Sequence, residues 1–301
     1  MAVADWIRIA ILSLVWGGSF FFVEVMLEAM PPMTSVLGRL IVGLAGLIGL
    51  LKLLGHPLRP LMTQWRSFAW IGLINNAIPF SLISFGQTEI TGSLASIINA
   101  STPIMTAVVA HQLTTDERLS LRKTLGIAFG FGGVLVLFGP AAMQGDASLL
   151  GMAAGLTATV CYAFGSVYSK RLKSNPPMLN ATGQVLYGTL WMFPVVCLID
   201  QPWSLPMPGI GPWLALMGIG LLSTTLAFFI YFRVLKTAGA SNVVLVTFLV
   251  PVSASALGIA FLGEVLAIQH ILAYLLIALG LAIIDGRIVA RLAQMRLKSH
   301  L

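Results

Sequence analysis

Two charged residues inside apolar stretches stand where they could do chemistry. Glu24 lies near the end of the stretch 6–27, and Arg39 lies about a turn and a half into the stretch 34–54. A carboxylate at such a place can bind a proton or a substrate amine, and a guanidinium can bind a carboxylate through two parallel hydrogen bonds. The structural alternative is an ion pair between Glu24 and Arg39 that braces two helix ends.

Polar and aromatic residues recur at helical spacing in six apolar stretches, where positions three or four apart share one face. Because the six stripes agree across the chain, they predict one central cavity. The predicted substrate-binding set is Trp16, Phe20, Glu24, Arg39, Asn76, Phe80, Asn99, Tyr162, Thr224, Phe228, Tyr231 and Thr247. The alternative for each residue is core packing or a hydrogen bond to a neighbouring helix. Pro103 and Pro251 are candidate hinges, with a static kink as the alternative.

Motifs for catalysis and for metal or cofactor binding are absent from the sequence. It contains no G-x-x-x-x-G-K-[ST] phosphate loop and no H-E-x-x-H helix, and Cys161 and Cys197 have no His or Cys nearby at metal-ligand spacing. We therefore expect no catalytic residues, no metal and no cofactor. Transport driven by nucleotide hydrolysis is disfavoured, and so is an intramembrane enzyme such as a protease or prenyl transferase.

The composition requires a membrane. Hydrophobic residues make up 58% and charged residues 9% of the 301 residues, and the mean hydropathy is +0.95. Such a chain has too little polar surface to cover a water-soluble globule, so we predict an all-α integral membrane protein. The net charge of +7 does not indicate nucleic-acid binding, because the Lys and Arg residues stand at the ends of apolar stretches.

Ten stretches have about the 20 apolar residues that a transmembrane helix needs. They are 6–27, 34–54, 67–87, 91–113, 121–139, 149–169, 180–199, 212–232, 239–262 and 268–289. Lys and Arg occur in the connections that follow even-numbered stretches and in the C-terminal tail, whereas the connections that follow odd-numbered stretches contain none. Both termini are therefore predicted to be cytoplasmic.

The chain also contains an internal repeat with an offset of 148 residues. Pro103 pairs with Pro251 and, after one deletion, Glu117 pairs with Glu264. Because five helices per half is an odd number, the second half must enter the membrane from the opposite face, so the repeats are inverted and can open a central site alternately to each side. The predicted domains are a first five-helix repeat at 1–140, a second, inverted repeat at 147–290 and a basic cytoplasmic tail at 291–301.

Together these features resemble the EamA branch of the drug/metabolite transporter superfamily. The resemblance rests on the duplicated half, the run Trp16-Gly17-Gly18-Ser19-Phe20, Arg39 in the second stretch and the proline helices that end near Glu117 and Glu264. It covers nearly the whole chain. It implies a ten-helix exporter of the bacterial inner membrane with a central cavity formed by helices one, three, four, six, eight and nine. Family members export amino acids, cysteine metabolites, purine-related compounds and toxic cations, so the resemblance does not choose the substrate.

We therefore expect a secondary transporter that exports small metabolites such as amino acids by alternating access. A lipid or lipid-precursor flippase on the same fold is the alternative. The expected partners are a small-molecule substrate and membrane lipids, without nucleic acid, in a monomer or homodimer. Protons are a candidate coupling ion through Glu24, and facilitated diffusion is the other possibility.

Overall fold

The computed structural model describes residues 2–114, 120–144, 148–172, 174–243 and 245–285, and all regular secondary structure within these ranges is helical. Nine of the described helical segments are long and apolar enough to cross a membrane, and a shorter apolar helix covers Ile268–Ile284. The predicted all-α membrane fold with ten transmembrane helices is confirmed. Glu117 and the predicted tail 291–301 lie outside the described residues.

The ten spans follow one another along the chain, and several are built from more than one helical piece. The first five spans and their short connecting helix are α1 (Val3–Leu27), α2 (Pro32–Leu53), α3 (Arg59–Thr63, connecting), α4 (Trp65–Gly72) with η1 (Leu73–Ala77) and α5 (Ile78–Gly86), α6 (Gly92–Asn99) with α7 (Thr102–Leu113), and α8 (Leu121–Gln144). The second five, with their connecting pieces, are α9 (Ser148–Ser169) with η2 (Lys170–Leu172), α10 (Pro177–Ile199), η3 (Pro202–Ser204, connecting), α11 (Ile210–Gly220) with η4 (Leu221–Leu226) and α12 (Ala227–Ala238), α13 (Ala240–Val243), α14 (Leu245–Leu257) with η5 (Gly258–Leu262), and α15 (Ile268–Asp285).

Prolines and glycines mark where several spans begin and end. Pro32 and Pro177 open α2 and α10, at a position where the N–H group that proline lacks would have no helical partner. Gly239 follows α12 and Gly263 follows η5, with φ angles of 81° and 68° that a side chain would strain. These residues therefore fix the ends of spans two, seven, eight and nine.

The two candidate hinge prolines have different surroundings. In span four the helix stops after Asn99 and resumes at Thr102, so Pro103 lies in the first turn of α7. A proline there lacks the N–H that would donate to the carbonyl of Asn99, and its ring clashes with that carbonyl, which explains the break after Asn99. Pro251 instead lies inside α14, which continues through it. A hinge motion at either proline stays a prediction.

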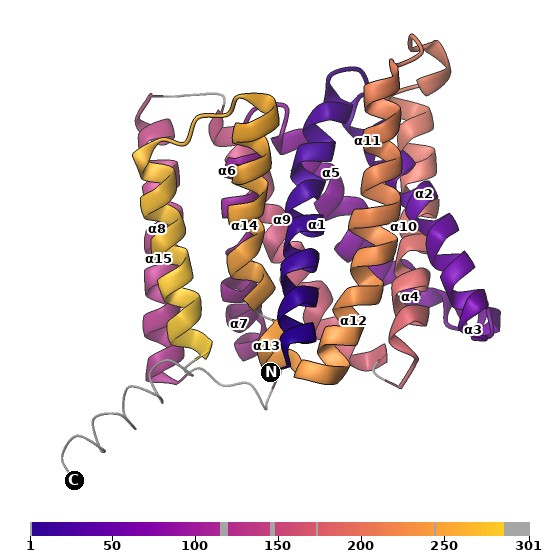
Figure 1. The fold of residues 1–301 in the computed structure, drawn as a ribbon, viewed down its shortest axis with the longest axis horizontal. Coiled ribbons are helices and arrows are strands. Elements are labelled where there is room, and N and C mark those ends of the chain that lie inside the picture. Colours follow the sequence, from indigo (N-terminus) through magenta and orange to yellow (C-terminus); the bar gives the residue numbers. More distant parts are fainter. Residues whose placement is uncertain (1, 115–119, 145–147, 173, 244, 286–301) are drawn as a thin grey trace.

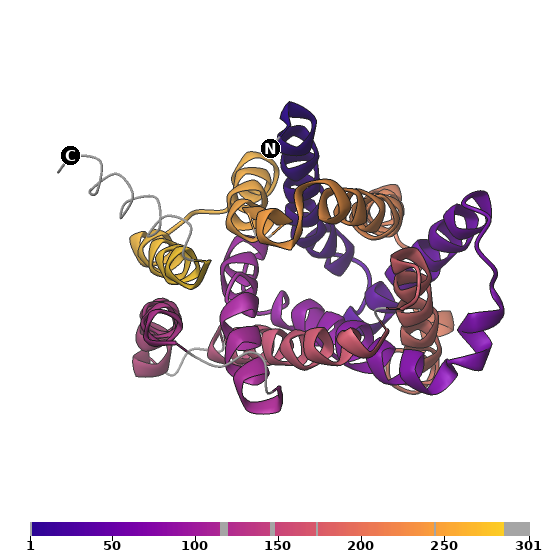
Figure 2. The same cartoon turned by 90° about the horizontal axis from the view of Figure 1, so that it is seen from below.

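The first span of each half packs mainly against helices of the other half. Helix α1 packs against α11, α12 and α14 of the second half, and α9 packs against α5, α6 and α7 of the first half. We call spans three, four and six the first bundle, and spans one, eight and nine the second bundle. Helices α2 and α10 pack together at one side of these bundles, and α8 and α15 form a pair at the other side (Figures 1 and 2).

Different helix ends lie at the two ends of the bundles. The start of α1 and the short helix α13 lie at the lower end in Figure 1, which we call the N-terminal face. The end of α1, the start of α6 and the end of η5 lie at the upper end, which we call the far face.

Candidate substrate cavity between the two bundles

A cavity of about 340 Å³ lies between the two bundles. The predicted residues that line it are Trp16, Phe20, Arg39, Asn76, Phe80, Asn99, Pro103, Tyr162, Thr224, Phe228, Thr247 and Pro251. The structure thus brings together side chains from stripes that are far apart in the sequence. Their role in substrate binding stays a prediction.

Glu24 and Tyr231 belong to the predicted set but do not line the cavity. Tyr231 packs behind its wall, with its ring centroid 5.6 Å from that of Trp16. Glu24 lies closer to the far face, where its Oε2 accepts a hydrogen bond of 2.9 Å from the main-chain N–H of Gly92. The ion pair considered between Glu24 and Arg39 is absent, because no described carboxylate lies within 4.0 Å of the Arg39 guanidinium.

Seven polar residues of the cavity wall are not in the predicted set, namely Ser19, Asn75, Gln87, Ser96, Thr102, Gln184 and Ser223. Gln184 lies on α10 and Arg39 on α2, so spans two and seven line the cavity in addition to the six predicted spans. The Nδ2 of Asn75 donates a hydrogen bond of 3.3 Å to Oε1 of Gln184, which joins span three to span seven. The repeat contained a signal for Gln184. Its position in the stretch 180–199 is nearly the position that Arg39 has in the repeat-equivalent stretch 34–54.

Two π-helical segments position the polar residues of spans three and eight. Segment η1 carries Asn75 and Asn76, and segment η4 carries Ser223 and Thr224, so the two lie at matching places in the two halves. In η4 the hydroxyl of Thr224 donates to the carbonyl of Ile219 at 3.0 Å, which satisfies a carbonyl displaced from the α-helical pattern. Such π-turns occur often at functional sites and widen the helix locally. Here they place amides and hydroxyls in the cavity wall.

Arg39 is the cation of the cavity. Its guanidinium carbon lies 3.9 Å from the centroid of the Phe80 ring, and its Nε donates a long hydrogen bond of 3.4 Å to Oγ1 of Thr224. The ring fixes one face of the guanidinium plane through a cation–π contact. Since a guanidinium has five N–H donors, most of them stay available to a bound anion.

Side-chain amides of the cavity wall have polar atoms without hydrogen-bond partners. These buried atoms are Oδ1 of Asn75, Nδ2 of Asn76, Oε1 of Gln87 and Oδ1 of Asn99, and all four residues line the cavity. Buried polar atoms in proteins nearly always have a partner, so a set of unpaired ones in a single cavity favours a polar ligand. No cluster of three or more metal-ligating side chains occurs in the part of the chain that the structure describes.

Several known bacterial proteins are similar to this chain in sequence. The chain is 27% identical to the protein PecM of Dickeya dadantii (strain 3937), over 90% of this chain and 89% of that protein. It is 25% identical to the transporter YoaV of Bacillus subtilis (strain 168), over 89% and 92% of the two chains. It is also 24% identical to the inner membrane transporter YedA of Escherichia coli (strain K12), over 85% and 82%.

The fold itself is also found in a solved structure. A crystal structure superimposes with a TM-score of 0.68 at 20% sequence identity, over 97% of this chain and 100% of the other. At that identity the likeness shows the fold alone. The sequence model of the EamA-like transporter family matches twice, at residues 6–139 and 149–285. The chain is a membrane transporter that belongs to the EamA-like transporter family.

Proposed function

We propose that the cavity binds a small metabolite with a carboxylate group, such as an amino acid, and that the chain exports it by alternating access. The main observation behind this proposal is that Arg39 lines the cavity and no described carboxylate lies within 4.0 Å of its guanidinium. A charge at the centre of a membrane helix costs roughly 2.5–3.5 kcal/mol. A substrate carboxylate would neutralise this charge and accept two parallel hydrogen bonds from the guanidinium.

Other polar atoms of the cavity wall suit the rest of an amino acid. The unpaired Nδ2 of Asn76 is a donor for a carboxylate, and the unpaired Oδ1 atoms of Asn75 and Asn99 are acceptors for an ammonium group. The rings of Trp16 and Phe228 offer apolar surface for a side chain. The cavity, at about 340 Å³, is within the range of small-molecule sites, roughly 300–1,000 Å³.

The packing of the first span of each half against the other half supports alternating access. Spans three, four and six of the first bundle are the repeat equivalents of spans eight, nine and one of the second. Two equivalent bundles around one site can therefore exchange conformations and open the site to either face. From the distribution of Lys and Arg we place both termini in the cytoplasm of a bacterial cell and the protein in the inner membrane, where YedA is also named as residing. Transport leaves the substrate chemically unchanged.

The proposal is tested by ligand stabilisation and flux of the purified full-length protein. Melting temperatures are measured with amino acids, purines and organic cations, and each hit is then followed as radiolabelled flux in proteoliposomes. A ligand at one hundred times its dissociation constant raises the free energy of unfolding by about 2.7 kcal/mol. We expect a zwitterionic amino acid both to stabilise and to move. Stabilisation by lipids alone would contradict the proposal and favour the flippase.

A further inference from the structure

Two carboxyl groups meet at the far face, outside the substrate cavity. The main-chain N–H of Gly92 donates to Oε2 of Glu24 at 2.9 Å, and that of Ser93 donates to Oε2 of Glu264 at 3.2 Å. Because Gly92 and Ser93 are consecutive residues in the first turn of α6, the two carboxyl groups lie side by side. The charge of Glu264 acts on the carboxyl group of Glu24.

These contacts connect the two bundles. Glu24 lies on α1 and Glu264 follows η5, both in the second bundle, whereas α6 belongs to the first. A third contact also has its donor in the first bundle and its acceptor in the second, since Nε2 of Gln87, at the end of α5, donates to the carbonyl of Phe20 on α1 at 2.9 Å. We call Glu24, Gln87, Glu264 and their main-chain partners the far-face clasp. The clasp must come apart before the cavity can open to this face.

Two ionised carboxylates cannot occupy this position together without strong repulsion. One proton held between Glu24 and Glu264 removes that repulsion and forms a short, charge-assisted O–H···O hydrogen bond. The remaining negative charge is stabilised by the N–H groups and the positive end of the α6 helix. The same N–H groups point at the carboxyl oxygens, so they disfavour a metal cation there.

A buried amide whose oxygen has no hydrogen-bond donor lies against the pair. The side chain of Gln87 is 7% exposed, and its Oε1 has no hydrogen-bond partner. A Cβ placed on Gly92 would lie 2.9 Å from Oε2 of Glu24 and 3.2 Å from Nε2 of Gln87, so the amide and the carboxyl border the same point. The hydroxyl of Ser93, fully buried, is also unpaired. The carboxyl pair therefore has an unpaired amide oxygen beside it and an unpaired hydroxyl on Ser93, whose main-chain N–H already donates to Glu264.

We propose that Glu24 and Glu264 hold one shared proton when the far face is closed, and that loss of this proton opens the far face. The proposal goes beyond the substrate site because it names the ion that couples to the conformational change. Two other titratable groups interact electrostatically with members of the pair: Glu28 acts on Glu24, and Glu264 acts on His270. Since the closed form binds the proton, low pH favours closure, and closure is lost as the pH rises.

The test measures the distance across the far face in the full-length protein. Spin labels are placed at Thr88, an exposed residue after α5, and at Val265, which is 85% exposed after η5, with Cys161 and Cys197 replaced by alanine. We expect a short distance at mildly acidic pH and a growing population of longer distances at mildly alkaline pH. In Glu264→Gln the amide donates permanently to Glu24, so the short distance should persist at both pH values.

Controls separate this proposal from its competitors. Glu24→Gln tests the same proton from the other carboxyl and should also abolish the response to pH, whereas Glu28→Gln should keep it. The proposal is overturned if both single variants of the pair respond to pH as the wild type does, or if the distance follows sodium concentration at constant pH. No substrate is needed, so the result can be interpreted even if amino acids prove not to be transported.

Discussion

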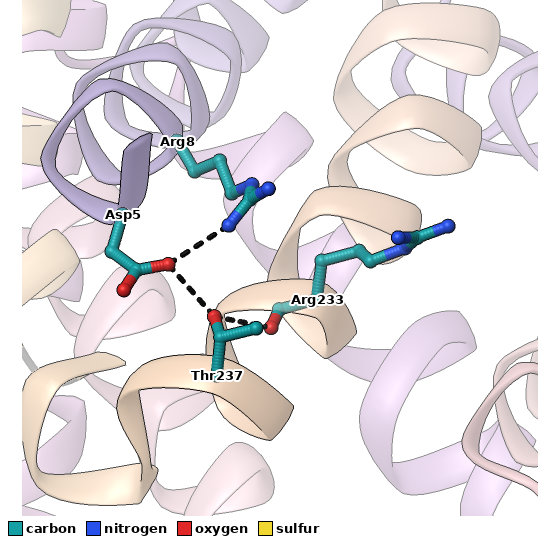
Figure 3. A network of polar contacts seen from close by, with 4 residues as sticks. All are labelled: Asp5, Arg8, Arg233 and Thr237. Carbon is teal, nitrogen blue, oxygen red and sulfur yellow. Dashed lines mark hydrogen bonds and ion pairs between the residues drawn. The ribbon is translucent and has the colours of Figure 1, made fainter. Parts of the chain in front are cut away.

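The polar contacts at the two faces join different partners. At the N-terminal face Asp5 accepts hydrogen bonds from Arg8 at 2.9 Å and from Thr237 at 2.8 Å, and Thr237 also donates to the carbonyl of Arg233 (Figure 3). These residues lie on α1 and α12, which belong to the same bundle. At the far face the clasp joins one bundle to the other. In the proposed mechanism, contacts inside a bundle would move with it, whereas the clasp would break when the far face opens.

Contacts within a bundle and contacts between the bundles should affect different properties: the first should affect the free energy of unfolding, and the second the balance between the closed and open far face. Residues that hold α1 on α12 and α14 should change how stable the second bundle is, without changing which face is open. Residues of the clasp should change the balance between closed and open forms, with a smaller effect on unfolding. Variants of the two kinds therefore test whether the bundles are the moving units.

The largest effect is expected from Gly17→Ala, inside the second bundle. A Cβ at Gly17 would lie 2.8 Å from the main-chain nitrogen of Ala254 and 2.9 Å from the carbonyl oxygen of Val250, and the α14 backbone cannot move aside as a flexible side chain would. Such overpacking lowers the free energy of unfolding by about 1–3 kcal/mol. Thermal melts check this against Gly49→Ala, where no atom lies within 4 Å of the added carbon. Equal losses in the two variants would show that α1 does not depend on this contact.

A smaller effect, on conformation, is expected from Gln87→Leu in the clasp. Leucine is similar in size to glutamine, so the substitution roughly keeps the packing volume but removes the hydrogen bond to the carbonyl of Phe20. Losing such a bond costs about 0.5–1.5 kcal/mol, so the ratio of open to closed far face should rise roughly two- to tenfold. The distance between labels at Thr88 and Val265 measures this ratio.

Thr237→Val is the matched control for Gln87→Leu, because it also removes one side-chain hydroxyl or amide contact to α1. It deletes the hydrogen bond to Asp5 but leaves the Arg8 contact in place. The melting temperature should fall slightly, and the far-face distance should not change. If Thr237→Val moves that distance as far as Gln87→Leu does, the division into two bundles is wrong.

The cavity wall was largely predictable because helical periodicity determines which residues share a face. Trp16 and Phe20, for example, fall on one stripe and line the cavity together. The contribution of Gln184 was not predictable from a single stripe, because α10 turns only this part of its polar surface toward the site. The π-helical segments η1 and η4 were also missed, since their main-chain pattern depends on tertiary packing and leaves no periodic signal.

The partners of Glu24 and Arg39 show the limit of arguing from neighbours in sequence. Their short connection suggested an ion pair, but α1 packs against the second half of the chain and not along α2. Glu24 is thereby turned to the start of α6, and Arg39 is left facing the cavity. The packing of α1 against the second half explains the positions of both Glu24 and Arg39. This packing is a property of the fold and cannot be read from neighbouring residues in the sequence.

The central claim is that Arg39 binds the carboxylate of the substrate, and one measurement tests it directly. Binding of an amino acid hit and of its carboxamide analogue is compared in the wild type and in Arg39→Gln by calorimetry. Hydrogen bonds to charged groups contribute roughly 1.5–3 kcal/mol, so replacing the carboxylate should weaken wild-type binding about tenfold or more. In Arg39→Gln the two ligands should bind about equally. An equal loss on going to the carboxamide in both proteins would contradict the claim.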